Sequence, residues 1–167
     1  SKLTASVARL GGQIFRTVEV VAGIDLASAK AKLADDMDAV EPAFNQNGII
    51  RLRNARHPLL DRETVVPISV SFGDPYKILL ITGPNTGGKT VGLKTAGLLV
   101  LMAQAGIPVP AARMEAPVFD AVLADIGDYQ SIEQNLSTFS AHVTNIDFIS
   151  RTATSRSATR WRRRRRA

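Results

Sequence analysis

The 167-residue sequence contains no cysteine, and this absence removes two classes of protein from consideration. A disulfide-stapled scaffold and a zinc site built on cysteine both need thiols. The lack of cysteine also fits a reducing compartment. Aromatic residues are scarce, at 5%, but hydrophobic residues make up 45% of the chain. The sequence can therefore bury a core, and wholesale disorder is excluded.

Long apolar runs are also missing. No uninterrupted apolar stretch of about 18 residues occurs, so we expect no membrane-spanning segment. The N-terminus lacks the charged, apolar and small-residue order of a secretory signal, and it begins with serine rather than methionine. We therefore expect a fragment of a larger protein.

Acidic residues are absent from residues 151–167, which hold eight of the 21 Lys and Arg residues. The chain as a whole has 15 Asp and Glu and a net charge of +6, so residues 1–150 carry a net charge of −2. The sequence pI near 10.2 thus belongs to the C-terminal segment. It does not by itself indicate that the folded body binds nucleic acid.

The C-terminal segment, residues 151–167, is rich in Arg, Ser, Thr and Ala. One hypothesis is disorder, because the segment buries too little apolar surface to offset its ordering entropy. A second is a basic arm that binds nucleic acid. A third is a shifted reading frame, because hydrophobic periodicity stops abruptly after Ile149 and GC-rich DNA read out of frame can encode arginine runs.

Hydrophobic spacing predicts alternating helices and strands. Apolar residues three to four apart indicate two helices, or one kinked helix, over residues 3–41. The other expected elements are strands at 49–52, 67–72, 77–82 and 118–126 and helices at 90–104 and 139–149. Because residues 77–82 are almost continuously apolar, we expect that strand to be covered on both faces. The order favours an α/β layer fold with a partly parallel sheet.

The strongest functional signal is residues 83–90, Gly-Pro-Asn-Thr-Gly-Gly-Lys-Thr, which satisfy the Walker A pattern G-x-x-x-x-G-K-[ST] between an expected strand and an expected helix. The three glycines let backbone N–H groups turn toward phosphate oxygens at the positive end of the helix. Lys89 would contact the β- and γ-phosphates of ATP, and the Thr90 hydroxyl would ligate Mg²⁺. The expected ATP-binding residues are Gly83, Pro84, Asn85, Thr86, Gly87, Gly88, Lys89 and Thr90.

A phosphate-binding loop does not hydrolyse ATP alone, because a second acidic element must hold Mg²⁺ and orient the attacking water. Asp120, Asp125 and Asp128 follow Lys89 in the sequence, but none ends a clean apolar strand with an acidic pair. We therefore expect nucleotide binding with little or no turnover, and no complete catalytic set in this chain.

Several segments together resemble the MutS family of mismatch-repair ATPases. They are the loop at 82–90, residues 101–106 followed by 109–111, residues 125–128 and residues 136–139. Residues 91–95 and 130–140 are most similar to the bacterial second branch, whose members carry a C-terminal Smr nuclease domain and are linked to suppressing recombination. Residues 54–60 resemble the entry into the family's ATPase domain. The resemblance runs from about residue 45 to 148.

The resemblance implies a fold: a P-loop NTPase of the ABC/MutS type, with a mixed sheet flanked by helices and incomplete at its C-terminus. Residues 1–41 would be the end of a helical lever, residues 42–150 the N-terminal part of the ATPase domain, and residues 151–167 the arginine-rich tail. The parent protein would bind mismatched or branched DNA in mismatch repair or suppression of homologous recombination. It would be cytoplasmic and nucleoid-associated in bacteria, with endonuclease activity from a Smr domain absent here.

The resemblance also assigns further site residues. Asp125, Asp128 and Gln130 would form a loop that senses nucleotide near Mg²⁺. Ser137, Thr138 and Phe139 would be the signature segment, which reaches the partner's γ-phosphate in a homodimer. The departure from the family comes after Ile149, where a hydrophobic strand ending in Asp-Glu is expected and the arginine-rich segment stands instead.

Simpler interpretations of these residues stay open. Ser137 and Thr138 could cap a helix that begins at Phe139, and Asp125 and Asp128 could be loop acids without a ligand. His57 is expected in a loop rather than as a catalytic base, and His142 is expected to face solvent or a partner surface.

Two alternative functions remain. One is a fragment of an ABC- or SMC-like chromosome ATPase, which shares the same loop and signature. The other is a non-enzymatic nucleic-acid binder that acts through its basic tail, with a steep dependence on salt.

Overall fold

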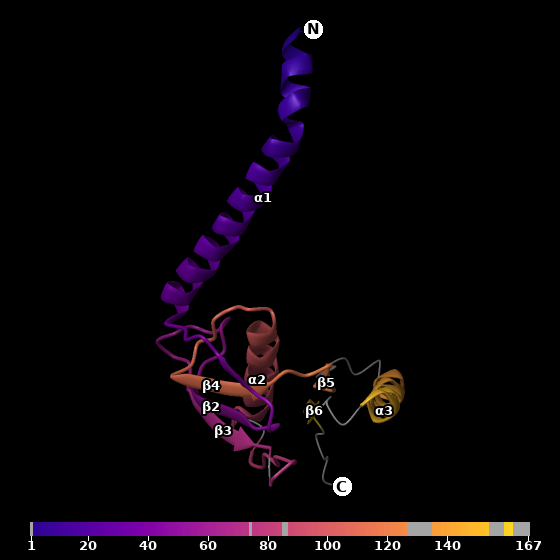
Figure 1. Cartoon of the computed structure of the whole chain (residues 1–167). Coiled ribbons are helices and arrows are strands. Elements are labelled where there is room, and N and C mark those ends of the chain that lie inside the picture. Colours follow the sequence, from indigo (N-terminus) through magenta and orange to yellow (C-terminus); the bar gives the residue numbers. More distant parts are fainter. Residues whose placement is uncertain (1, 74, 85–86, 127–134, 154–158, 162–167) are drawn as a thin grey trace.

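The computed structural model describes residues 2–73, 75–84, 87–126, 135–153 and 159–161. A long helix, α1 (Lys2–Met37), extends away from a body formed by a sheet and helix α2 (Lys89–Gln104), and helix α3 (Asn135–Thr152) lies to one side of that body (Figure 1). The strands are β1 (Ala43–Asn45), β2 (Ile50–Ala55), β3 (Ile68–Phe72), β4 (Arg113–Pro117), β5 (Val122–Ala124) and β6 (Thr159–Trp161). Among the described residues, no helix is both long enough and apolar enough to cross a bilayer.

Residues 3–37 form one continuous helix, so the three glycines at 11, 12 and 23 do not divide it. The helix ends in a Schellman arrangement, in which Asp38 takes the left-handed conformation with φ 48°. The Ala39 N–H donates to the Ala34 carbonyl at 2.9 Å, and the Asp38 N–H donates to the Asp35 carbonyl at 3.2 Å. These bonds occupy carbonyl groups that the end of a helix would otherwise leave without partners.

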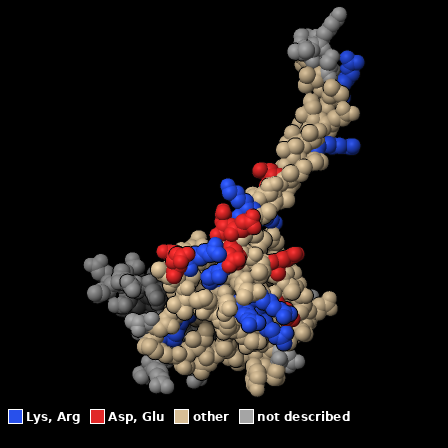
Figure 2. Space-filling view, turned by 90° about the vertical axis from the view of Figure 1, so that its left-hand side faces the viewer, with Lys and Arg blue, Asp and Glu red and all other residues tan. Residues whose placement is uncertain are grey.

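The junction between α1 and the body is built from Arg56, which follows β2. Its guanidinium donates to the carbonyls of Met37 and Asp38, both at 3.1 Å, and pairs with the Asp38 carboxylate at 3.4 Å. A cation at a helix C-terminus also interacts favourably with the helix dipole. Figure 2 shows acidic and basic side chains gathered together where α1 meets the body. The direction of α1 is thus set by contacts at its C-terminal end.

The larger sheet has the order β1-β4-β2-β3 and is mixed. Strand β2 runs antiparallel to both β3 and β4, and only β1 pairs in parallel, with β4. The expected P-loop NTPase fold is therefore wrong: the described residues form a small mixed sheet with helices, and the strand predicted at 77–82, which was expected to be covered on both faces, is not formed. An apolar strand of that kind needs neighbours on both sides, and no described strand pairs with these residues.

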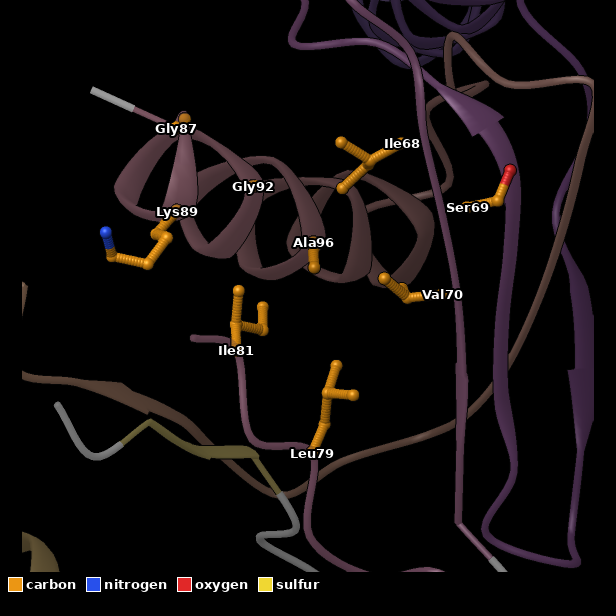
Figure 3. Close-up of a pocket in the computed structure, with 10 residues that line it drawn as sticks. Ile68, Ser69, Val70, Leu79, Ile81, Gly87, Lys89, Gly92 and Ala96 are labelled. Carbon is orange, nitrogen blue, oxygen red and sulfur yellow. The ribbon is translucent and has the colours of Figure 1, made fainter. Parts of the chain in front are cut away.

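The apolar segment 77–82 keeps a weak alternation despite having no strand partner. The side chains of Ile78 and Leu80 are largely exposed, whereas Leu79 and Ile81 line a cavity beside α2. Figure 3 shows Leu79 and Ile81 directed toward that helix. The segment therefore packs through one side only.

The core lies between α2 and the sheet. Helix α2 buries positions along one stripe, namely Thr95, Ala96, Leu99, Val100 and Ala103. The sheet contributes the alternate inward residues Ile50 and Leu52 of β2 and Met114 and Ala116 of β4. The buried residues are three to four positions apart in the helix and two apart in the strands. This is the spacing expected when each element buries one face. This packing fixes the middle and C-terminal part of α2 against the sheet.

Two short strands form a second sheet. Strand β5 pairs in parallel with β6, with Val122 opposite Thr159 and Ala124 opposite Trp161. Strand β6 lies inside the arginine-rich segment, so three residues of that segment have a defined partner in the fold.

Candidate phosphate-binding loop

The loop predicted to bind phosphate lies between the 77–82 segment and α2. Its described glycines include Gly83, with φ 140°, and Gly88, with φ 71°. An L side chain rarely adopts these values. A Cβ placed on either glycine would meet no atom of the described residues within 4 Å. The backbone conformation therefore explains the glycines, and open space lies beside them.

Helix α2 starts at Lys89 with Gly88 as its N-cap, and no side chain that the structure describes caps it. The first N–H groups of a helix have no partner within the helix. Because glycine offers no side chain to accept from them, these donors and the positive end of the helix dipole point out of the helix end. That arrangement suits an anion.

The Lys89 ammonium folds back over this loop. Its Nζ donates to the Gly83 carbonyl at 2.6 Å and also to the Pro84 carbonyl. Backbone carbonyls are neutral acceptors, whereas phosphate oxygens carry charge and form stronger bonds with an ammonium. The lysine is thus held within the loop, and a bound phosphate would offer it better acceptors than it has now.

A cavity of about 310 Å³ adjoins the loop between α2, β3 and the 77–82 segment (Figure 3). Lys89, Gly87 and Gly88 lie at one end, and most of the remaining lining is apolar. The other lining residues are Ile68, Ser69, Val70, Leu79, Ile81, Gly92 and Ala96. The Lys89 side chain and the apolar lining residues therefore border the same cavity.

The structure describes only some of the predicted site residues. Thr90 lies in the first turn of α2, half-buried beside Lys89. The predicted residues outside the described part of the chain are Asn85, Thr86, Asp128 and Gln130. Within the described residues, no group of three or more His, Cys, Asp and Glu could hold a metal ion.

The signature residues are placed by their backbone alone. Ser137, Thr138 and Phe139 lie near the start of α3, which begins at Asn135; their side chains are outside the described part of the structure. The alternative in which Ser137 and Thr138 cap a helix starting at Phe139 is wrong, because both residues are already inside the helix.

The two histidines differ in their surroundings. His57 lies in a loop, as expected, and its Nδ1 accepts from the Leu59 N–H at 3.3 Å. His142 does not simply face solvent: its Nδ1 lies 2.8 Å from Oδ1 of Asp125, and its side chain is 25% exposed. Sequence reasoning missed this contact, although His142, Asn145 and Ile149 share one helical face, which is the available signal.

Comparisons with known proteins identify the relatives of this chain. Residues 79–159 match the model of MutS domain V. The chain is 54% identical over 156 residues to the endonuclease MutS2 of Thermomicrobium roseum, covering 86% of this chain and 20% of that protein. It is 60% identical over 132 residues to the endonuclease MutS2 of Geobacillus kaustophilus, covering 78% and 17%. For the endonuclease MutS2 of Finegoldia magna the identity is 57% over 134 residues, covering 80% and 17%.

The chain therefore spans about a fifth of the length of the curated relatives it matches. These relatives carry the name of MutS2 proteins rather than of chromosome ATPases of the SMC type.

Proposed function

Because the chain is a MutS2-type fragment of the MutS family, we propose that residues 83–90 bind the phosphates of ATP together with Mg²⁺. The observation that carries the proposal is the uncapped start of α2 beside Lys89, whose ammonium is held across the loop by backbone carbonyls. Backbone N–H donors and a cation thus lie at the same end of α2, and this is the chemistry that a triphosphate needs.

The residues present fit this ligand. Lys89 exchanges its bonds to Gly83 and Pro84 for phosphate oxygens, and the α2 N–H groups donate to the same ligand. The Thr90 hydroxyl would be the residue of this loop that holds Mg²⁺, an ion commonly held by few protein ligands. When bound, the ion neutralises phosphate charge.

ATP turnover by this chain is proposed to be weak. The described residues bring no cluster of acidic side chains together that could hold the metal and orient water. Asp125, Asp128 and Gln130 belong to the proposed nucleotide-sensing loop, and Ser137, Thr138 and Phe139 to the segment that meets a second copy in a homodimer.

For the whole protein, we propose a DNA-binding ATPase of bacteria that acts on mismatched or branched DNA in repair or in suppression of recombination, near the nucleoid. The support is the similarity to proteins named endonuclease MutS2. Nuclease activity would come from a part of the protein outside these 167 residues.

The test is ATP binding by the chain and by its Lys89→Ala variant, measured by titration with a fluorescent ATP analogue in the presence of Mg²⁺. Loss of a hydrogen bond to a charged group should weaken binding by about 10- to 100-fold. Lys94→Ala is the matched control, because Lys94 is an exposed lysine of the same helix. Equal affinity for the wild type and Lys89→Ala, or no binding by the wild type, contradicts the proposal.

A further inference from the structure

The carboxylate of Asp125 joins the end of β5 to one face of α3. His142 Nδ1 lies 2.8 Å from Asp125 Oδ1, and Asn145 Nδ2 donates to the same oxygen at 3.2 Å. Asn145 Nδ2 also donates to the carbonyl of Ala124, the last residue of β5, at 3.3 Å. An ionised carboxylate can only accept, so the His142 Nδ1 carries the hydrogen of the first contact.

These contacts are shielded from solvent. The Asp125 side chain is 15% exposed and the His142 side chain 25%. By contrast, the Asp147–Arg151 pair on the same helix, at 2.8 Å, joins side chains that are 56% and 80% exposed. An exposed pair adds little to stability, whereas a shielded hydrogen bond to a charged group adds more. The Asp125 contacts are therefore the stronger of the two sets.

The burial of α3 differs along the helix. Of the α3 side chains that the structure describes, only Ile149 is fully buried, and Val143 and Phe148 are about half exposed. His142, Asn145 and Ile149 lie at positions i, i+3 and i+7, so they form one stripe along the helix. Two donors one turn apart on one oxygen fix the rotation of the helix about its axis as well as its distance from β5.

We propose that Asp125 and His142 are positioning residues that clamp α3 to the end of β5, so that a displacement at Asp125 moves the whole helix. The role of this clamp in responding to nucleotide rests on the proposed function. In that proposal Asp125 belongs to the nucleotide-sensing residues, and α3 carries Ser137 and Thr138 near its start. A helix moves as a rigid element, so a pull at His142 is delivered to its first turn.

The first experiment measures the clamp without nucleotide, by hydrogen exchange of the α3 amides in the full chain. His142→Ala should accelerate exchange about tenfold, because it removes one hydrogen bond to a charged group. Asp125→Ala should accelerate exchange at least as much, because it also removes the acceptor of Asn145. The double variant should exchange no faster than Asp125→Ala alone, since the contact of His142 is already lost when Asp125 is removed. Amides of α2 report whether the rest of the chain stays folded.

Two further variants separate positioning from packing. His142→Asn places an amide donor where Nδ1 lies, so it should preserve most of the protection that His142→Ala loses. Asp147→Ala removes only the exposed pair with Arg151 and should leave exchange nearly unchanged. The clamp is overturned if the effects of Asp125→Ala and His142→Ala add, or if His142→Asn is as damaging as His142→Ala.

The second experiment adds ATP and Mg²⁺. In the wild type and in His142→Asn, nucleotide should change the exchange of the α3 amides. In His142→Ala this response should disappear while ATP affinity, measured by the same titration, is unchanged. If His142→Ala still responds, the coupling is refuted. If the wild type does not bind ATP, the proposed function fails, and the nucleotide-free cycle still decides whether the clamp exists.

Discussion

Replacing Arg56 by alanine should loosen the C-terminal end of α1. One guanidinium nitrogen donates to two carbonyls at the end of the helix, both at 3.1 Å, and lies 3.4 Å from the Asp38 carboxylate. The Arg56 side chain is 20% exposed, so water screens these contacts only partly.

The expected loss of stability depends on the fact that one guanidinium nitrogen of Arg56 serves several acceptors. A hydrogen bond from a charged donor is worth about 1.5–3 kcal/mol, but a single nitrogen serves all three acceptors, so their contributions do not add. The carbonyls can also be partly rehydrated after the substitution. We therefore expect the free energy of local opening to fall by about 1–2 kcal/mol, a factor of roughly 5–30 in the opening equilibrium.

Arg62→Ala is the matched control. Arg62 pairs with the same Asp38 carboxylate at 3.3 Å, but its side chain is 53% exposed. Within the described part of the chain it donates to none of the α1 carbonyls. Such a pair contributes about 0–1 kcal/mol. Hydrogen exchange of the Ala39 and Val40 amides measures both variants, because these N–H groups donate to Ala34 and Val109. Equal acceleration by the two variants would refute the capping role of Arg56.

Two further substitutions test the packing of the body. Leu99→Ala removes a fully buried side chain of α2 between helix and sheet, so urea unfolding should show a loss of about 2–5 kcal/mol in the free energy of unfolding. A smaller loss than that caused by Leu101→Ala, at an exposed leucine of the same helix, would contradict the described core. Gln104→Ala removes two hydrogen bonds to the backbone of Phe119, at 2.9 and 3.0 Å. It should lower the free energy of unfolding, measured by thermal unfolding, by about 1–3 kcal/mol, because a buried N–H loses its partner. Gln104→Glu keeps the acceptor, so its stability should fall between those of the wild type and Gln104→Ala.

Local pattern was sufficient to predict the elements whose buried face repeats regularly. Helix α2 and strand β3 were expected at 90–104 and 67–72 and are found at Lys89–Gln104 and Ile68–Phe72. Each has its own turn or glycine signal at one end. Strand β4 was not predicted, because only two of its five residues, Met114 and Ala116, are apolar side chains buried in the core. They alternate with Arg113, Glu115 and Pro117, which are not typical of strands. Its strand character comes from pairing with β1 and β2, which composition does not reveal.

For residues 77–82 the error is the reverse: a strand was predicted, and none is formed. Their composition is that of a buried strand, yet strand structure depends on hydrogen bonds to neighbours, and no described strand pairs with them. The same limit applies to the site: the glycines and Lys89 follow from a local motif, whereas the contact of Asp125 with His142 joins residues 17 positions apart on different elements. Only the fold brings those two together.

Helix α2 has Lys89 at its start, and Ala105, the residue after its C-terminal end, contacts α1. This helix has 16 residues, so it spans roughly 24 Å from Lys89 to its C-terminal end. There, Lys30 of α1 donates to the carbonyl of Ala105 at 3.3 Å, a long and exposed bond. The two backbone bonds between Val40 and Val109, both 2.9 Å, and the contacts of Arg56 are shorter. The attachment of α1 to the body therefore relies more on the Val40–Val109 bridge and on Arg56 than on Lys30.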